Sequence, residues 1–358
     1  MSVVAVLGAG GGGLSCTAEL SLAGHSVRLW NRTEASLPGS GVISYSGVLG
    51  EGSVTAAASS TDLRVVLDGV DAVVVSLPAL GHGAVFAGLA ALGCAVPVVL
   101  NPGHTGGALH LRRVFAASGV PLPPVAELST LTYVARRPPG DPGGVRITGR
   151  AGRVRCAALP GGEAAAACAA ALFPGTLSTV PDVLATSLSN VNLVLHPPGA
   201  ILSAAWVEAT GGAFTFYVAA MTDGVGRVVD ALDAERRAVA AAFGHKLPSL
   251  AEEMALVGTV PASLAGSGDT AAAVRAGEAN KTLRAPDSLG HRYYREDFPY
   301  AVTPFLALAA IAGVDTPVAA ALLTVARALT GGCDGGLDAA GLGIGGLTVD
   351  GLLGLVRG

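Results

Sequence analysis

Residues 3–24 read VVAVLGAGGGGLSCTAELSLAG. The first five of them form an apolar run of strand length, and a glycine turn and an amphipathic helix follow. Within the turn, Gly8, Gly10 and Gly13 have the spacing G-x-G-x-x-G. Between a strand and a helix, the first glycine permits a tight turn, the second lets a pyrophosphate approach, and the third lets helix and strand pack closely. The stretch therefore predicts a dinucleotide-binding loop.

Strand and helix patterns continue to alternate beyond this loop. A second strand is expected at Ser26–Trp30, where the return of a βαβ unit falls. Two alternating strands on either side of Gly149–Gly152 predict an antiparallel hairpin over residues 144–158, at the edge of the sheet. This alternation predicts an α/β fold with a doubly wound parallel sheet of the Rossmann type. The other strand candidates are Arg64–Val66, Ala72–Leu77 and Val96–Leu100.

Helical patterns replace strand patterns after Pro181. Ser249 and Glu252 have the spacing of a capping box at the start of one helix. A polar stretch, Gly277–Pro299, is long enough to be a functional loop. We therefore predict a dinucleotide-binding domain of residues 1–180 and an all-helical domain of residues 181–358. The longer helices expected here are Asp182–Leu195, Gly199–Glu208 and Phe214–Phe243, the last ended by Gly244.

The composition limits the class of protein. Hydrophobic residues make up 51% of the chain and charged residues 13%, which excludes disorder, and no apolar run reaches the roughly 18 residues that cross a bilayer. A net charge of −4, without a basic tract, excludes nucleic acid as an expected partner. The N-terminal residues lack the pattern of a secretory signal, so we expect a cytoplasmic protein that acts on small molecules.

The cysteines predict neither disulfides nor a metal site. They are odd in number and contain no CxxC pair, so we expect reduced, mostly buried thiols. The five are Cys16, Cys94, Cys156, Cys168 and Cys333.

The end of the second strand indicates which dinucleotide is bound. An NAD-selective fold usually places an acidic residue there to bind the adenosine ribose, but this chain has Asn31, Arg32 and Thr33. The Arg32 guanidinium suits a 2′-phosphate, and its neighbours add hydrogen-bond donors. The sequence therefore predicts NADPH in preference to NADH.

Three further segments carry a resemblance to a known family. They are LNPGHTGGAL at 100–109, SNVNLVLHP at 189–197 and RYYREDFPYAVTP at 292–304. In content, order and spacing they resemble the opine dehydrogenases, the octopine and nopaline dehydrogenase family, and especially its bacterial members that make carboxyethyl amino acids. The resemblance spans nearly the whole chain. It implies that an amino acid and an α-keto acid condense to an imine, which a nicotinamide cofactor reduces to an opine-type secondary amine.

A polar helix face contains the histidine of the second segment. Ser189, Asn192 and His196 have helical spacing, and Pro197 is expected to limit the helix beyond the histidine. Spacing alone leaves a structural and a catalytic histidine equally open. The resemblance implies that His196 transfers protons and that Asp297 orients it. Glu296, beside Asp297, is expected to be solvated or bonded to backbone.

The same resemblance implies clamps for the two substrate carboxylates. Arg292, five residues before Asp297, matches the family's arginine for the amino-acid carboxylate. Thr130 matches a threonine near the keto acid, and Arg136 matches an arginine whose role is either substrate binding or structural. His104 departs from the small or amide residue expected at its position, and we assign it no catalytic role. The family further implies a homodimer.

The amino donor is indicated only indirectly. Aromatic side chains in the helical domain either line the substrate pocket or belong to the core. If they line the pocket, an apolar amino acid is favoured over arginine. The aromatic residues in question are Trp206, Phe214, Phe216, Tyr217 and Tyr293.

Two other functions remain open at this stage. One is a hydroxy-acid or polyol-phosphate dehydrogenase, whose relatives generally rely on a lysine. The only lysines here are Lys246 and Lys281, and neither lies in such a motif. The other is a non-catalytic NADPH-binding sensor, which the combination of His196, Asp297 and Arg292 disfavours.

Overall fold

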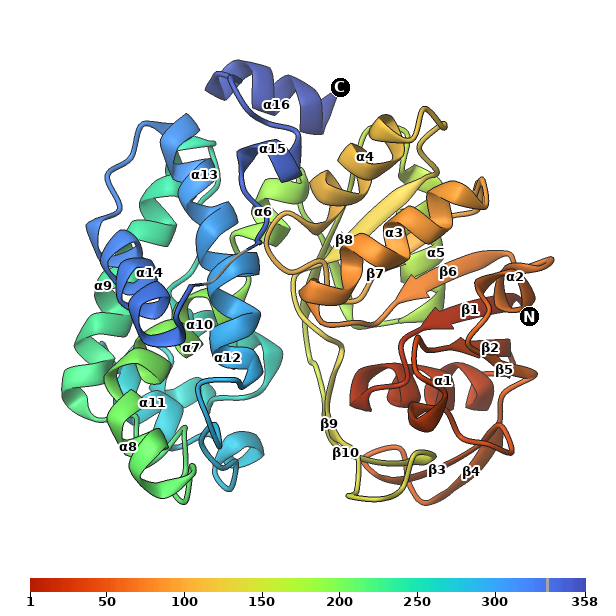
Figure 1. Ribbon diagram of the computed structural model, residues 1–358, viewed down its shortest axis with the longest axis horizontal. Coiled ribbons are helices and arrows are strands. Elements are labelled where there is room, and N and C mark those ends of the chain that lie inside the picture. Colours follow the sequence, from red (N-terminus) through yellow and green to blue (C-terminus); the bar gives the residue numbers. More distant parts are fainter. Residues whose placement is uncertain (333–334) are drawn as a thin grey trace. The chain divides into compact units, whose positions relative to one another are not determined.

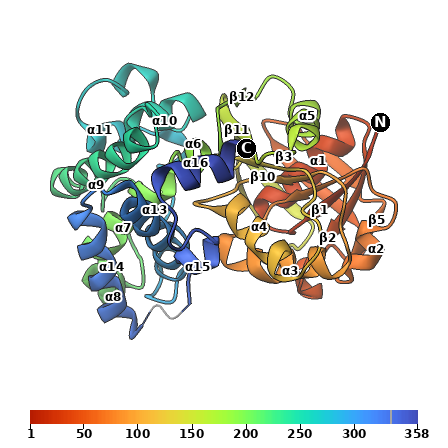
Figure 2. The same ribbon diagram turned by 90° about the horizontal axis from the view of Figure 1, so that it is seen from above.

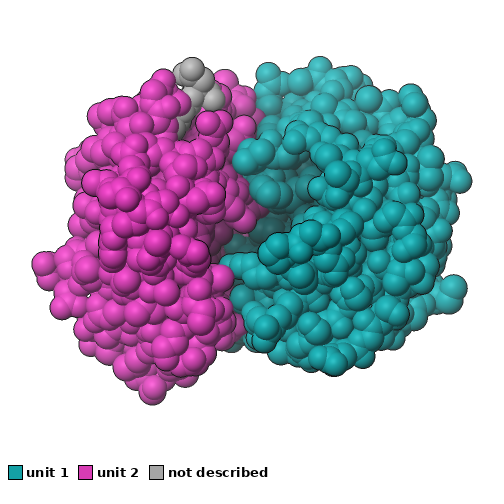
Figure 3. Space-filling view, turned by 60° about the horizontal axis from the view of Figure 1, so that its bottom comes forward, with its two compact units in different colours: residues 1–103, 107–183 teal, residues 104–106, 184–358 magenta. Residues whose placement is uncertain are grey.

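The computed structural model describes residues 1–332 and 335–358 (Figure 1). The chain divides into two compact units, coloured separately in Figure 3. The first unit contains residues 1–103 and 107–183, and the second contains residues 104–106 and 184–358. The chain thus enters the second unit for three residues, returns to the first, and leaves it again after Val183.

An eight-stranded sheet forms the centre of the first unit, in the order β12-β11-β8-β7-β6-β1-β2-β5. All neighbouring pairs are parallel except β11 and β8, which are antiparallel. The chain starts in the middle at β1, builds outward to β5, and then resumes beside β1 with β6, which is the doubly wound arrangement predicted. The strands are β1 (Val3–Leu7), β2 (Ser26–Trp30), β5 (Ala58–Ser60), β6 (Ala72–Val75), β7 (Val98–Leu100), β8 (Val125–Leu128), β11 (Val154–Ala158) and β12 (Leu177–Thr179).

Helices cover both faces of this sheet. Figure 2 shows α1 and α5 on one face and α2, α3 and α4 on the other. The central strands are buried on both sides, so they consist of continuous apolar runs instead of alternating patterns. The helices are α1 (Gly11–Leu22), α2 (Leu63–Leu67), α3 (His82–Ala91), α4 (Gly107–Ala117) and α5 (Glu163–Leu172), with short 3₁₀ turns η1 (Glu34–Ser36) and η2 (Ala79–Gly81).

A second, four-stranded sheet packs on α1 in the order β4-β3-β10-β9. Glu19 of α1 anchors it, because this carboxylate accepts a hydrogen bond from the Tyr133 hydroxyl and pairs with Arg150 at 2.8 Å. The sequence did not predict this sheet, since its strands are short and only partly apolar. They are β3 (Val42–Gly47), β4 (Gly52–Thr55), β9 (Tyr133–Arg136) and β10 (Gly144–Arg150).

The second unit is helical, as predicted. Ser249 forms the expected capping box with Glu252, and its hydrogen bonds lower the pKa of the Glu252 carboxyl. The longer helices are α7 (Val191–Leu202), α9 (Asp223–Ala242), α10 (Leu250–Val257), α13 (Thr303–Ala312), α14 (Pro317–Thr330) and α16 (Val349–Arg357). The shorter ones are α6 (Val183–Ser187), α8 (Ala204–Thr210), η3 (Ala262–Leu264), α11 (Thr270–Arg275), η4 (Glu278–Asn280), α12 (Arg292–Arg295), the π-helix η5 (Phe298–Val302) and α15 (Ala339–Leu342).

Two strand predictions in the first unit were wrong. Residues Arg64–Val66 belong to α2, because the Asp62 carboxylate accepts a hydrogen bond from the Arg64 amide and caps a helix there. The hairpin predicted over residues 144–158 does not form either. Its two strands, β10 and β11, pair in different sheets, so the glycines between them carry the chain from one sheet to the other.

Helix limits in the second unit also differ from the prediction. The helix expected over Asp182–Leu195 is broken before α7, where the Asn190 side chain accepts a hydrogen bond from the Asn192 amide. Ser189 precedes α7 and therefore does not share a helical face with His196. Pro197 does not end the helix, which runs on through Leu202.

A similar shift affects α9. Residues 214–222 form turns instead of the first part of a long helix, and α9 begins at Asp223 because the Thr222 hydroxyl accepts a hydrogen bond from the Val225 amide. Figure 1 shows α9 as one of the long helices of the second unit.

Within the described residues, no helix combines the length and the apolar character needed to span a membrane. Four cysteines in this part of the chain are unpaired thiols, and burial raises the pKa of each. The fifth, Cys333, lies outside the described residues.

Candidate active site and cofactor loop

The glycine loop joins β1 to α1 in the first unit, as predicted. Gly8 has φ +124°, and a Cβ atom there would lie 2.2 Å from the Ser76 carbonyl oxygen. A Cβ atom on Gly13 would lie 1.7 Å from the Gly8 carbonyl oxygen. Apart from Gly10 itself and its two chain neighbours, no described residue has an atom within 4 Å of the Cβ position at Gly10, which N-caps α1. Two glycines are thus required by packing, and the third leaves room at a helix N-terminus, which suits a pyrophosphate.

Asn31 lies at the end of β2 and braces this loop. Its Oδ1 accepts a hydrogen bond from the Ala9 amide at 3.2 Å, and its Nδ2 donates to the Thr33 carbonyl oxygen at 3.1 Å. Arg32 and Thr33 are exposed beside it. The Arg137 Nη1 atom donates to the Ala9 carbonyl oxygen at 2.9 Å, so the Arg137 guanidinium reaches the loop. Arg137 could not be predicted from the sequence, because it follows β9 of the sheet that the sequence did not predict.

Thr130 also belongs to the first unit, in the half-buried turn after β8. Two residues further on, the Thr132 hydroxyl accepts a hydrogen bond from Asn101 Nδ2 at 2.9 Å, which ties this turn to the end of β7. Arg136, at the end of β9, is exposed and donates to its neighbour's carbonyl oxygen, that of Ala135. The first unit therefore contains the glycines, residues 31–33 and Thr130.

His196 and Asp297 meet in the second unit, although 101 residues separate them. His196 lies on α7, and Asp297 lies between α12 and the π-helix η5, both of which pack against α7. The Nδ1 atom of His196 is 2.8 Å from Asp297 Oδ2, and both residues are buried. Because a carboxylate accepts hydrogen bonds, this contact assigns the proton to Nδ1 and makes Nε2 an acceptor in the neutral ring.

Aromatic side chains surround the imidazole. The Tyr217 hydroxyl is 2.8 Å from His196 Nε2, and it is 3.0 Å from the Tyr293 hydroxyl. The Tyr293 ring stacks on the imidazole with a centroid distance of 3.9 Å, and the Phe216 ring meets it edge-on at 6.1 Å. These three aromatic residues are buried, as is Phe214. Trp206, by contrast, is 43% exposed and stacks on Phe214 with a centroid distance of 3.8 Å.

Glu296 forms a second buried acidic position beside Asp297. Its Oε2 atom is 3.0 Å from Arg292 Nε, and its Oε1 atom is 3.9 Å from His104 Nε2. The expectation of a solvated Glu296 was wrong, because its side chain is 2% exposed and pairs with arginine. Burial opposes the charge of Arg292, but Glu296 and Asp297 outweigh this effect and raise the pKa of the guanidinium.

His104 itself has φ +57°, a backbone conformation that is uncommon outside glycine. The residues that follow it bind to the segment that leads into α7. The Asn190 Nδ2 atom donates to Thr105 Oγ1 at 3.1 Å, and the Gly106 amide donates to Ser187 Oγ at 3.0 Å. Residues 104–106 thus support the start of the helix that holds His196.

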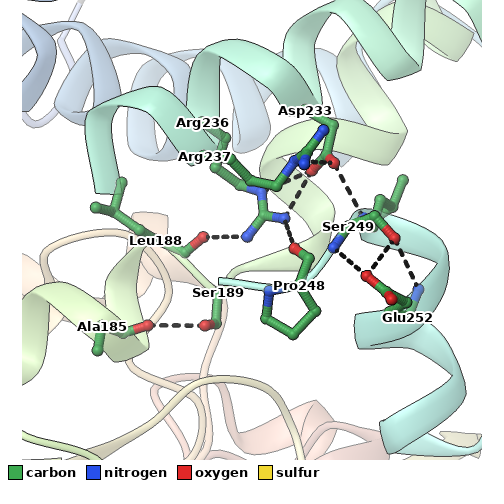
Figure 4. A network of polar contacts seen from close by, with 10 residues as sticks. Ala185, Leu188, Ser189, Asp233, Arg236, Arg237, Pro248, Ser249 and Glu252 are labelled. Carbon is green, nitrogen blue, oxygen red and sulfur yellow. Dashed lines mark hydrogen bonds and ion pairs between the residues drawn. The ribbon is translucent and has the colours of Figure 1, made fainter. Parts of the chain in front are cut away.

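A buried arginine also holds the residues that lead into α7 (Figure 4). Arg236 of α9 is 1% exposed. It donates to the carbonyl oxygens of Leu188 at 2.9 Å and Pro248 at 2.6 Å, and to Asp233 Oδ1 at 2.8 Å. Asp233 also accepts from the Leu250 amide at 3.2 Å. This network connects α9 to the start of α10 and to the residues before α7.

The Rossmann unit and the helical unit with a buried histidine–carboxylate pair define an NAD(P)-dependent oxidoreductase. Residues 179–330 match the family model of the α-helical domain of NAD/NADP octopine/nopaline dehydrogenases. Over 332 residues the chain is 31% identical to an opine dehydrogenase of Arthrobacter sp. (strain 1C), covering 91% of this chain and 90% of that relative. The chain therefore belongs to the opine dehydrogenase family.

Two solved structures show the same fold. A yersinopine dehydrogenase without ligands superposes with a TM-score of 0.76 at 18% identity, covering 92% of this chain and 90% of that chain. An octopine dehydrogenase bound to NADH and L-arginine gives a TM-score of 0.74 at 18% identity, covering 99% of this chain and 98% of that chain. The predictions of family and of fold class are confirmed.

The family assignment gives the reaction of this enzyme, which is the NAD(P)H-dependent reductive coupling of an amino acid with an α-keto acid. It favours this reaction over a hydroxy-acid or polyol-phosphate dehydrogenase and over a non-catalytic sensor. The prediction of a nicotinamide cofactor is confirmed.

Proposed function

We propose that His196 is the proton-transfer residue of the coupling and that Asp297 positions it. The observation that carries this proposal is the buried contact of 2.8 Å between Nδ1 and the carboxylate. The reaction needs a group that removes a proton from the incoming ammonium and returns one to the carbinolamine hydroxyl. An imidazole can both accept and donate a proton, so His196 can perform both transfers, and the carboxylate stabilises the imidazolium between them.

Arg292 is the proposed clamp for the amino-acid carboxylate. Glu296 engages its Nε atom, and among the described residues no hydrogen-bond partner is seen for the two terminal nitrogens. A guanidinium held in this way presents its forked edge to an anion, which suits bidentate carboxylate binding. Thr130 is the proposed contact at the keto-acid end, and its support is the family resemblance of the segment STLTY at residues 129–133.

The proposed dinucleotide domain is residues 1–180, with the helical substrate domain in residues 181–358. Gly8, Gly10 and Gly13 form a loop with room for a pyrophosphate at the N-terminus of α1. When bound, the cofactor supplies the hydride for the reduction.

NADPH is the proposed cofactor in preference to NADH. The exposed Arg32 side chain supports this choice, and Asn31 holds the adjoining backbone. Replacing Arg32 by alanine is expected to raise the KM for NADPH far more than the KM for NADH. Equal changes for the two cofactors, measured by steady-state kinetics, would contradict the assignment.

The amino donor is proposed to be apolar, because the side chains around His196 are mainly aromatic. The test is a panel of amino acids with pyruvate and NADPH, followed by cofactor oxidation and by the mass of the product. Oxidation that requires the amino acid supports the coupling, whereas equal oxidation with pyruvate alone would favour a hydroxy-acid dehydrogenase. Fastest turnover of arginine would contradict the apolar donor.

His196→Ala tests the proton-transfer assignment in the same assay. The variant is expected to lose the coupling while its affinity for NADPH, measured by fluorescence titration, stays within about twofold. Unchanged turnover would remove His196 from the mechanism.

A homodimer is the proposed assembly. Apolar side chains on three helices of the second unit support it, because they remain exposed in the single chain. Leu202 is 53% exposed, and Trp206 and Val325 are each 43% exposed. Sedimentation equilibrium at micromolar concentration is expected to give twice the chain mass, and a monomer there would contradict this assembly.

A cytoplasmic location is also proposed. The unpaired thiols of the described cysteines support it, because reducing compartments keep cysteines in this state. A fluorescent fusion is expected to fill the cytoplasm, and export of the protein would contradict the proposal.

A further inference from the structure

Both ring nitrogens of His196 already have a partner in the second unit. The Nδ1 atom lies 2.8 Å from the Asp297 carboxylate, and the Nε2 atom lies 2.8 Å from the Tyr217 hydroxyl. Since Asp297 accepts the Nδ1 proton, Nε2 is the nitrogen that gains and loses protons during a reaction. A substrate therefore exchanges protons with His196 either after the Tyr217 hydroxyl has moved aside or through that hydroxyl.

The position of Tyr217 is held by the backbone around it. The preceding amide, of Phe216, donates to the Leu283 carbonyl oxygen at 2.9 Å, and Thr215 forms a β-bridge with Arg284. The Ala219 amide donates to the Thr215 carbonyl oxygen at 2.9 Å, which closes the turn that holds Tyr217. Because these contacts lie on both sides of Tyr217, moving the hydroxyl away from the imidazole requires a change in the turn or in the side-chain rotamer.

The hydroxyl of Tyr217 also has a second contact. It lies 3.0 Å from the Tyr293 hydroxyl, so the imidazole and two phenols form one continuous hydrogen-bonded chain. A phenol donates one hydrogen bond and accepts others, so it can pass a proton on without holding a charge. The Tyr293 ring also stacks on the imidazole with a centroid distance of 3.9 Å, so Tyr293 contacts both His196 and Tyr217.

We propose that Tyr217 is a catalytic residue through which His196 exchanges protons with the substrate, and that Tyr293 positions it. The proposal rests on the role of His196 in the proposed function. The observation behind it is the hydrogen-bonded series Asp297–His196–Tyr217–Tyr293, in which each residue is nine-tenths or more buried.

The substrate ammonium breaks an N–H bond and gives its proton to the Tyr217 oxygen, while the Tyr217 hydroxyl proton moves to His196 Nε2. A neutral amine and an imidazolium result. The amine nitrogen then attacks the keto-acid carbonyl carbon, so that a C–N bond forms and the C=O π bond opens. One N–H proton moves to the carbonyl oxygen and gives the neutral carbinolamine. On the return, the Nε2 proton passes to the Tyr217 oxygen, and the tyrosine proton passes to the carbinolamine hydroxyl. Its C–O bond then breaks, water departs with the electron pair, and an iminium ion remains for reduction.

Tyr217→Phe is the direct test, because it removes one oxygen atom and keeps the ring. In the coupling assay with pyruvate and NADPH we expect kcat to fall by about 10² to 10⁴-fold, the range for loss of a positioned acid–base group. The KM for the amino acid and the affinity for NADPH are expected to stay within about threefold. Tyr293→Phe is expected to lower kcat less, by about tenfold.

Tyr294→Phe is the matched control. Tyr294 is the neighbour of Tyr293 and is fully buried, but its hydroxyl donates to the Ala200 carbonyl oxygen and lies outside the proton chain. Its kcat is expected to stay within about twofold of the wild-type value. The double variant of His196→Ala with Tyr217→Phe is expected to be no slower than His196→Ala alone, because residues that act as one unit are not additive.

The alternative outcomes separate the two proposals. One outcome is that the wild type couples pyruvate to amines, that His196→Ala is inactive, and that Tyr217→Phe is as fast as the wild type. This outcome overturns the proton relay through Tyr217, while His196 keeps its role. Losses in Tyr217→Phe and Tyr294→Phe of similar size would also overturn the relay, because they indicate a packing effect. If the wild type oxidises NADPH without consuming the amine, the proposed function and the relay are overturned together.

Discussion

The glycine loop of the first unit and the histidine cluster of the second are built in different ways. Backbone forms the loop, and Gly8 and Gly13 are needed because any side chain there would overlap a carbonyl oxygen. Side chains form the cluster, and His196 depends on a carboxylate 101 residues away. A short sequence motif can encode the loop, because the loop depends mainly on residues close in sequence. The cluster forms only when helices distant in the sequence pack together.

Gly13→Ala is expected to have the largest effect, because it tests the steric origin of the loop. The new Cβ would lie 1.7 Å from the Gly8 carbonyl oxygen, so the turn and α1 cannot both keep their positions. We expect loss of the cooperative unfolding transition of the first unit, measured by circular dichroism during heating. Gly10→Ala is the control, since no described residue apart from Gly10 and its two chain neighbours has an atom within 4 Å of its Cβ position. It should fold normally and bind NADPH weakly, and normal melting of Gly13→Ala would refute the steric explanation.

Asp297→Asn tests whether the cluster depends on charge or only on shape. An amide can donate to Nδ1 and so favour the wrong tautomer of His196, and in a comparable triad this change lowers kcat by about 10⁴-fold. We expect a loss of that order in the coupling reaction, with cofactor affinity unchanged. A loss smaller than about tenfold, in steady-state assays of the folded variant, would show that the carboxylate acts only as a packing group.

Arg236→Ala tests the support behind the cluster. It leaves the buried carboxylate of Asp233 without its main partner, and breaking such a pair costs about 3 to 5 kcal/mol of unfolding free energy. Arg237→Ala is the matched control, because Arg237 pairs with the same carboxylate but its side chain is 46% exposed. Arg237→Ala is expected to lower the free energy of unfolding by less than about 1 kcal/mol. Urea denaturation measures both, and similar losses would contradict the difference in burial.

Glu296→Gln is expected to have the smallest effect. It removes the charge that orients Arg292, whose side chain is 47% exposed, so solvent weakens the pair. A loss of about 1 kcal/mol of binding free energy corresponds to a KM for the amino acid that is roughly fivefold higher, and kcat is expected to stay nearly unchanged. If kcat falls and KM does not, Glu296 acts on the proton chain and not on the clamp.

Local patterns in the first unit could be predicted from the sequence because they depend on neighbouring residues. The run Val3–Leu7, the glycine spacing and the strand Ser26–Trp30 all appear where expected. The pattern at Arg64–Val66 is misleading, because so short an apolar stretch is compatible with either a strand or a helix. The Asp62 cap favours the helix. The two strands around Gly149–Gly152 were found, but the sequence did not show that they pair in different sheets.

In the second unit, His196 and Asp297 were found by resemblance, and their meeting could not follow from spacing. Tyr217 was seen only as one aromatic among several, because its hydrogen bond to His196 depends on a turn where a helix was expected. Glu296 stood next to Asp297 in the sequence, yet its ion pair with Arg292 depends on burial, which one sequence does not reveal.

The excursion of residues 104–106 into the second unit affects how such enzymes can be recombined. Consider a chimera that joins the first half of one family member to the second half of another at residue 183. Its second unit would then contain residues from both parents. The segment containing Thr105 and Gly106 would come from one parent, and its partners Asn190 and Ser187 from the other. We expect working chimeras to carry this short segment along with the helical half, so that two separate stretches of the gene are inherited together.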